Sequence, residues 1–332
     1  MKNSWKKPPI SKMLALLCML LIFWNPSDAA ELHLLGGIIR DTSMSDFSYT
    51  YSVEYKQELG EYTAASLSYL NEGHLPDHHR DGIALQMWGH TKPMRRHFVL
   101  AAGLGPYYYY DTDLAGRGAS FRDDHGLGAM FSIAGLWYTK SPWVIQLRTN
   151  FIKTNNIDTY SAMLGVGYRL DYQQKHVSSS GVQHAPEKTR NNEIAVLIGQ
   201  TIVNSRSSPK STAQSIEYRR RITSYLEWTV ALLNEGDNRL IRRNGLISQA
   251  WLVRDFFDEH LSLGAGFGPY VLIDRYRSPD NNESEETLAG IVTLSASYRF
   301  TPTWLIRLSW NRIATTYNRD TDVFLIGPGF RF

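Results

Sequence analysis

The chain has 332 residues, of which 43% are hydrophobic, 12% aromatic and 20% charged, and its formal net charge is +3. This near-balance excludes the strongly basic composition of many nucleic-acid-binding proteins, so we expect no nucleic-acid partner. A single cysteine, Cys18, excludes a disulfide framework. The sequence has no phosphate-binding glycine loop, paired-cysteine motif or serine-nucleophile elbow, and we therefore expect no cofactor and no metal centre.

The N-terminus has the organisation of a secretory signal peptide. A segment with four lysines precedes an apolar run over residues 13–24, and the small residues Ser27 and Ala29 follow. The apolar run of about 12 residues is shorter than the roughly 20 that a membrane anchor, the alternative, would need. We predict a signal peptide over residues 1–29. Its removal takes away four lysines and Asp28, so that 35 basic and 32 acidic residues become 31 and 31.

Two motifs recur at one offset of about 163 residues, which indicates an internal duplication. Asn71-Glu72-Gly73 returns as Asn234-Glu235-Gly236, and Gly103-Leu104-Gly105-Pro106-Tyr107 returns as Gly266-Phe267-Gly268-Pro269-Tyr270. We predict two copies of one unit joined by a polar linker, with the boundaries 30–171 for the first repeat, 172–190 for the linker and 191–332 for the second repeat.

Each copy alternates between apolar and polar residues with the period of a β-strand. The alternation is clearest over residues 48–56, where tyrosines and Val53 face one way and polar residues face the other. Strands of about 10 residues, joined alternately by short turns and longer polar loops, favour a transmembrane antiparallel barrel over a soluble β-sandwich. The predicted strands of the first copy are 31–40, 48–59, 61–72, 82–92, 95–110, 127–139, 142–154 and 158–171.

Aromatic residues lie at the two ends of the predicted strands. The run Tyr107–Tyr110 ends the fifth strand, and Trp137 and Tyr138 end the sixth. Because tyrosine and tryptophan gather at both membrane interfaces, we interpret the two groups as aromatic girdles.

The last predicted strand, residues 324–332, is apolar and aromatic at every second position and stops at Phe332. It resembles the terminal strand that outer-membrane proteins offer to their assembly machinery. With the signal peptide, this strand predicts export through the periplasm into the outer membrane of a Gram-negative bacterium. Outer-membrane lipid, lipopolysaccharide and the assembly machinery are the expected partners.

The sixteen strands can close in two ways. We favour one barrel of sixteen strands, because only the second copy ends in a strand with the full terminal signal at Phe332. Two barrels of eight strands are the alternative, since the predicted linker is longer than a single barrel needs. Sixteen strands would leave an aqueous lumen, whereas eight are filled by side chains.

Each copy also resembles the small eight-stranded outer-membrane barrels and, within them, the lipid A deacylase family. The residues that carry this resemblance are 98–110, 71–73 and 158–161. It implies an acidic catalytic position at Asp158 and Asp320 and a His-x-Ser pair that supplies base and nucleophile. At the place where the family has this pair, the two copies read Thr149-Asn150-Phe151-Ile152 and Trp310-Asn311-Arg312-Ile313. The His-x-Ser pair is therefore absent from both copies.

Two sets of polar residues are candidate functional groups. The first set is expected at the outer rim, where its carboxylates are candidate ligands for a divalent cation that contacts lipopolysaccharide: Asn71, Glu72, Asp111, Asp158, Asn234, Glu235, Asp274 and Asp320. The second set is expected to face the lumen: Glu54, Lys56, Gln86, Arg148, Glu217, Arg219, Gln249 and Arg307.

A histidine-rich loop at 74–81 is interpreted as a solvated loop rather than a metal site. The expected function is a non-enzymatic pore or envelope component. The alternatives are a lipid A-directed enzyme or binder that has lost the His-x-Ser pair, and a structural barrel whose outer loops bind a partner.

Overall fold

The structure is a computed structural model. It describes residues 30–42, 47–75, 78–92, 97–114, 121–170, 172, 190–205, 208–238, 240–275, 285–315, 317 and 319–332. The predicted signal peptide and residues 173–189 of the predicted linker lie outside the described residues. No helix in the described part of the chain is long and apolar enough to span a membrane.

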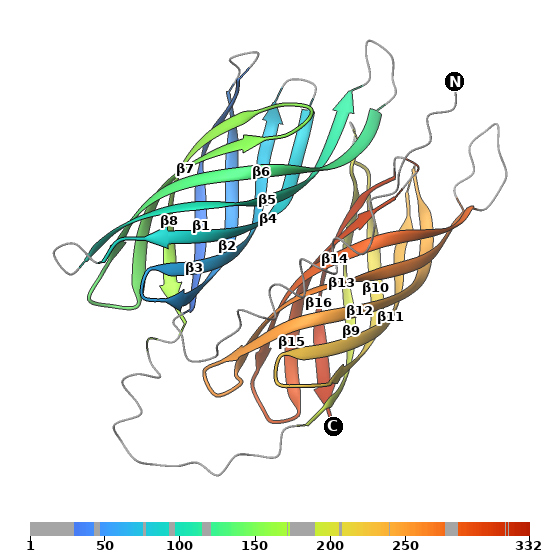
Figure 1. Ribbon diagram of the computed structural model, residues 1–332. Helices are drawn as coiled ribbons and strands as arrows, with labels where there is room; N and C mark the ends of the chain where they lie inside the picture. The colour runs from blue at the N-terminus through green and yellow to red at the C-terminus, as the bar shows by residue number, and fades with distance from the viewer. Residues whose placement is uncertain are drawn as a thin grey trace. The chain divides into compact units, whose positions relative to one another are not determined.

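Eight antiparallel strands close the first barrel, and each strand pairs with its neighbours in sequence (Figure 1). Strand β8 returns to β1, from the pair Glu31–Arg169 to the pair Asp41–Thr159. The strands are β1 (Ala30–Asp41), β2 (Phe47–Gly60), β3 (Thr63–Leu75), β4 (His78–His90), β5 (Phe98–Leu114), β6 (Phe121–Tyr138), β7 (Trp143–Lys153) and β8 (Thr159–Arg169).

The second barrel has the same order of strands and is closed by pairing between β16 and β9 (Figure 1). Its strands are β9 (Asn192–Val203), β10 (Lys210–Arg221), β11 (Leu226–Asp237), β12 (Arg242–Phe256), β13 (Leu261–Asp274), β14 (Glu285–Arg299), β15 (Trp304–Ala314) and β16 (Thr321–Arg331). Residues 222–225, 257–260 and 300–303 form short turns at one end, called the short-turn end below; the opposite end is called the long-loop end.

The all-β fold with eight-stranded units is confirmed, but the preference for a single barrel of sixteen strands is wrong. Two separate sheets close, one in each repeat. The physical reason lies in the edges: β1 and β8 use their edge hydrogen bonds on each other, as do β9 and β16. After that pairing, neither sheet has an edge left for the other.

Both barrels bury polar residues and expose apolar ones. In β7, Trp143, Ile145 and Leu147 are 51%, 47% and 60% exposed, whereas the alternating Gln146 and Arg148 are each 1% exposed. This arrangement follows from the period of two, because every second side chain points into a closed barrel. An apolar exterior around a polar interior is the inverse of a water-soluble protein.

Side chains fill the interiors. In the first barrel, one buried apolar cluster contains Leu35, Leu70 and Met163, and a second contains Trp88 and Leu136. In the second barrel, a buried cluster that includes Leu233, Tyr270 and Leu325 crosses the lumen. Eight strands leave an interior just wide enough for side chains, so these layers close both barrels.

Candidate functional site

The repeated Asn-Glu-Gly motif lies at the end of the third strand of each barrel, and in the second barrel the pairing with β12 shifts there by a bulge between Asn234 and Gly236. The Asn71 Oδ1 atom accepts a hydrogen bond from the Gly73 amide at 2.9 Å, and Asn234 does the same for Gly236 at 2.8 Å. Both glycines have a positive φ, 68° and 83°. Glycine adopts this left-handed conformation readily, and a bulge re-aims the neighbouring side chain. The intervening glutamate is thereby buried inside the barrel.

In the first barrel, this glutamate lies at the centre of a buried polar network. Arg80 binds Glu72 through two hydrogen bonds, at 2.6 Å and 2.9 Å. The hydroxyls of Tyr107 and Thr159 donate to the same carboxylate at 2.7 Å and 2.8 Å. The ring of Tyr109 lies under the Arg80 guanidinium at 5.9 Å. A fully buried carboxylate is stable only when it is paired and hydrogen-bonded in this way.

The second barrel builds the same arrangement from corresponding residues. Arg243 pairs with Glu235 at 3.3 Å and with Asp274 at 3.4 Å, and the Thr321 hydroxyl donates to Glu235 at 2.6 Å. The Tyr317 hydroxyl donates to Asp274 at 3.2 Å. Burial raises the pKa of Tyr317, which keeps this hydroxyl protonated.

The two central arginines, Arg80 and Arg243, were not among the residues singled out from the sequence. They recur at the same offset as the Asn-Glu-Gly motif, so the repeat itself contained the signal. The predicted rim carboxylates Glu72, Glu235 and Asp274 are therefore arginine-paired groups inside the barrels.

The other acidic residues predicted at the rim form hydrogen bonds with nearby backbone or side-chain groups at the ends of strands. Asp158 accepts a hydrogen bond from the Thr154 amide at 3.1 Å, and Asp320 accepts one from the Thr315 amide at 2.7 Å. Asp111 contacts the His78 ring at 3.0 Å. The described residues include no group of three histidine, cysteine or acidic side chains that could hold a metal ion. His74 and Asp77 of the predicted histidine-rich loop have no described side chain.

A second shared network crosses the middle of each barrel. Gln86 donates to the Ser132 hydroxyl at 2.9 Å, and this hydroxyl donates to Asn150 at 2.7 Å. In the second barrel, Gln249 donates to the Thr293 hydroxyl and this hydroxyl to Asn311, both at 2.8 Å. These hydrogen-bonded series of side chains connect the fourth, sixth and seventh strands of each unit. Their members therefore identify positions that correspond in the two barrels.

The predicted lumen residues of the first barrel meet beside Trp88. Arg148 binds Glu54 at 2.5 Å and Gln86 at 2.7 Å. The Arg148 guanidinium and the Lys56 ammonium lie 5.0 Å and 5.4 Å from the centre of the Trp88 ring. Such cation–π contacts lower the energy of charges that are removed from water. All these groups are engaged across the lumen.

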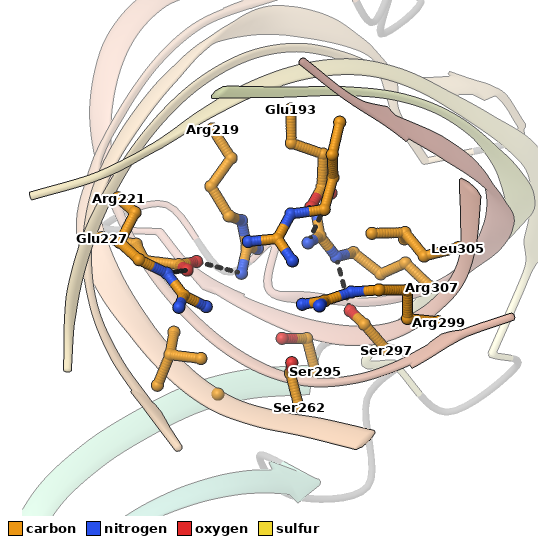
Figure 2. A pocket seen from close by; sticks show the side chains of 13 residues that line it. Glu193, Arg219, Arg221, Glu227, Ser262, Ser295, Ser297, Arg299, Leu305 and Arg307 are labelled. Carbon is orange, nitrogen blue, oxygen red and sulfur yellow. Dashed lines mark hydrogen bonds and ion pairs between the residues drawn. The ribbon is translucent and has the colours of Figure 1, made fainter. Parts of the chain in front are cut away.

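The lumen residues of the second barrel form a larger ionic network at the short-turn end. Arg307 is hydrogen-bonded to Glu217 and lies 2.6 Å from Glu193. Arg219 binds Glu217 at 3.1 Å and lies 3.8 Å from the centre of the Trp251 ring. Arginines, glutamates and serines point toward one another across the barrel (Figure 2).

This network surrounds a pocket to which all eight strands contribute (Figure 2). Its atom-free volume is about 360 Å³, but the side chains leave room for only about one or two water molecules. The lining residues are Glu193, Arg219, Arg221, Glu227, Val253, Ser262, Gly264, Ser295, Ser297, Arg299, Leu305, Arg307 and Arg331.

Some of the polar lining positions are apolar in the first barrel. With the strand correspondence above, Ala64 stands at the position of Glu227, and Leu136 stands at the position of Ser297. Both Ala64 and Leu136 belong to the buried cluster around Trp88. The pocket is thus a property of the second barrel and is not required by the fold that the two units share.

The predicted aromatic girdle is wrong for part of the tyrosine run. Tyr107, Tyr109 and Tyr110 are buried, and Tyr107 points at Glu72. Trp137, by contrast, is exposed on the outer surface, as a girdle residue would be.

No protein-family model and no curated protein sequence match the chain. Among solved structures, the N-terminal β-barrel domain of Pseudomonas aeruginosa OprF is 16% identical, with a TM-score of 0.36, over 42% of this chain and 96% of that domain. Neisserial surface protein A is 10% identical over 43% and 96%, with a TM-score of 0.34. Ail, the attachment invasion locus protein of Yersinia pestis, is 11% identical over 43% and 97%, with a TM-score of 0.33. All three are eight-stranded outer-membrane barrels.

Proposed function

We propose that this chain is a Gram-negative outer-membrane protein that spans the membrane as two plugged eight-stranded barrels and serves as a non-enzymatic envelope component. The inverted surface of each barrel carries the proposal. Water would have to solvate a continuous apolar belt around such a barrel, whereas hydrocarbon accommodates it. Closure of both sheets supports the same environment, because lipid offers no hydrogen-bonding partner to a strand edge.

The C-terminal strand supports insertion by the outer-membrane assembly machinery. Phe324, Ile326 and Phe330 are exposed on one face of β16, and Phe332 follows the strand and is exposed as well. This apolar face is the pattern that such machinery would recognise, and the predicted signal peptide supplies the export route. Outer-membrane lipid and lipopolysaccharide would then surround both barrels.

An open transport pore is the less favoured function. The pore hypothesis depended on a lumen of sixteen strands, and each barrel has only eight. Arg148 with Glu54, and Arg307 with Glu217, cross the two interiors as buried ion pairs. Apolar layers lie in both lumens as well.

Conductance separates these functions. Full-length protein, refolded and inserted into planar bilayers, should give no openings or rare, small ones, because a hydrated ion cannot pass the buried layers without rearrangement. Frequent, long-lived openings of porin size would contradict the proposal. An unrelated sixteen-stranded porin inserted in the same bilayers provides the positive control.

The geometry of the polar networks does not favour the alternative function, a lipid A-directed enzyme or binder. Acyl chains lie outside the barrel, whereas the polar networks around Glu72 and Glu235 are enclosed within it. Asp158 and Asp320, the acidic positions implied by the resemblance, each accept a backbone hydrogen bond in a turn. Mass spectrometry of lipid A from cells that overproduce the protein should show unchanged acylation; loss of an acyl chain would favour the enzyme instead.

The predicted cation contact at the outer rim stays a prediction. Glu72 and Glu235 are already neutralised by Arg80 and Arg243, so an arginine takes the place that a divalent cation would have at each of these carboxylates.

A further inference from the structure

The short-turn end of the second barrel gathers arginines around its pocket, and carboxylates that lie beside the lining, among them Glu217 and Asp255, also contact these arginines. Five arginines line it, with only two carboxylates in the lining itself. In the first barrel, Glu58, Tyr138 and Gln146 occupy the positions that correspond to Arg221, Arg299 and Arg307. Three additional cations therefore distinguish this pocket from its counterpart in the same fold.

The arginines nearest the opening share one carboxylate, and Arg221 also binds Asp255 at 2.7 Å and Glu227 at 3.2 Å. Glu259, in the turn between β12 and β13, lies 2.6 Å from Arg299, 3.7 Å from Arg221 and 3.8 Å from Arg331. Its side chain is 33% exposed, whereas Arg307 deeper in the pocket is 3% exposed. The site occupied by Glu259 can therefore be reached from the short-turn end.

The turn that carries Glu259 has an unfavourable backbone. Phe257, Asp258 and Glu259 have φ values of 53°, 53° and 65°, which place three consecutive non-glycine residues in the left-handed region. L-residues avoid this conformation because Cβ approaches the carbonyl oxygen too closely. Contact between the Glu259 carboxylate and the arginines offsets part of that strain, so the carboxylate and the turn conformation are energetically linked.

We propose that Arg221, Arg299 and Arg331 form a binding site for a small oxyanion, a carboxylate or phosphate group, and that Glu259 occupies this site when no ligand is bound. Guanidinium groups match the oxygen spacing of carboxylates and phosphates and bind them through paired hydrogen bonds. The Arg299 guanidinium donates to Glu259 at 2.6 Å, and an oxyanion that displaces Glu259 would accept this hydrogen bond in its place. A ligand that displaces Glu259 would also release the turn from its left-handed conformation.

The matched variants are Glu259→Ala and Glu61→Ala. Glu259→Ala removes the internal carboxylate from the three arginines. Glu61→Ala removes a carboxylate that binds Lys92 at 2.9 Å in the first barrel, where both side chains are 66% exposed. Full-length variants refolded in detergent would be titrated with acetate and with inorganic phosphate at constant ionic strength, set with sodium chloride. Thermal unfolding would be followed by tryptophan fluorescence.

We expect Glu259→Ala to unfold at a lower temperature than the unsubstituted protein and to be restored in a saturable way by acetate, phosphate or both. Glu61→Ala should respond to neither anion beyond the unsubstituted protein. Stronger rescue by phosphate would identify a phosphate-bearing ligand, and stronger rescue by acetate a carboxylate. Responses that do not saturate, or that are equal in the two variants, would overturn the proposal.

A second measurement does not depend on the stability of the alanine variant. The isosteric Glu259→Gln variant should broaden the ³¹P resonance of inorganic phosphate at concentrations where the unsubstituted protein does not. Adding Arg299→Gln to it should weaken the apparent phosphate affinity at least tenfold. Equal broadening with and without Arg299 would show that phosphate does not bind these arginines, and the proposal would be wrong.

Discussion

The glycine of the Asn-Glu-Gly motif shows how one residue helps to place a buried charge. An ideal Cβ added at Gly73 would lie 2.2 Å from the Tyr49 carbonyl oxygen, far closer than van der Waals contact, and the φ of 68° is itself unfavourable for other residues. Glycine here permits the left-handed backbone beside Glu72, which is buried. The same reasoning applies to Gly236 and Glu235 in the second barrel.

Gly73→Ala should therefore destabilise the first barrel by at least about 1–2 kcal/mol, since alanine pays the left-handed penalty and clashes with β2. The measurement is the urea midpoint of refolded full-length protein. Gly36→Ala is the control, because an added Cβ there meets nothing within 4 Å. Equal midpoints for the two variants would mean that the backbone around Gly73 relaxes at little cost.

The Glu72–Arg80 pair gives a second prediction at this scale. Both side chains are almost fully buried, so Arg80→Met would leave a carboxylate without its cation inside the barrel. Loss of one partner of a buried pair costs about 3–5 kcal/mol. Lys92→Met breaks an exposed pair with Glu61 and should leave the urea midpoint unchanged. A small effect of Arg80→Met would show that Tyr107 and Thr159 suffice to hold the carboxylate.

At the scale of the strand, alternation decides which residues face lipid. Leu147 lies in the middle of β7 and Phe47 is the first residue of β2, yet they are similarly exposed, at 60% and 65%. Only the depth in a membrane separates them. Leu147→Arg should cost about 2–4 kcal/mol in lipid vesicles, and Phe47→Arg about 0–1 kcal/mol. Equal costs, measured by urea unfolding in vesicles, would contradict the proposed membrane position.

Corresponding strands can also carry different interiors. Leu136 on β6 packs in an apolar layer, whereas Ser297 on β14 lines the charged pocket. Both residues point inward, so the strands keep their pairing while the chemistry of the lumen changes. Because the lumen residues can change without changing the strand pairing, the second barrel can carry an anion site that the first barrel lacks.

At the scale of the whole molecule, the number of barrels determines whether a function as an open pore is physically reasonable. Eight strands close around side chains, whereas sixteen leave an aqueous lumen. Since β8 pairs with β1 and β16 pairs with β9, the chain has two filled interiors. The expected near-absence of conductance in planar bilayers follows from this closure and not from any single residue.

Strand positions were largely accessible from the sequence. The prediction of 48–59 compares with β2 at Phe47–Gly60, and that of 142–154 with β7 at Trp143–Lys153. The strand that was predicted to begin at residue 127 begins instead at Phe121. The period-two alternation places Tyr107 and Tyr109 on the inward face with Ala101, and for this reason these two tyrosines are not girdle residues.

The sequence by itself determined the strands, their two faces and the repeat of the Asn-Glu-Gly motif, because period-two alternation and glycine conformation are local properties. Only the tertiary structure decided which strand pairs with β8. Pairing with β1 and pairing with β9 satisfy the same backbone groups, so no local pattern distinguishes them. The tertiary structure also brought Glu72 to Thr159 and Glu259 to three arginines, since those contacts join strands that are far apart in the sequence.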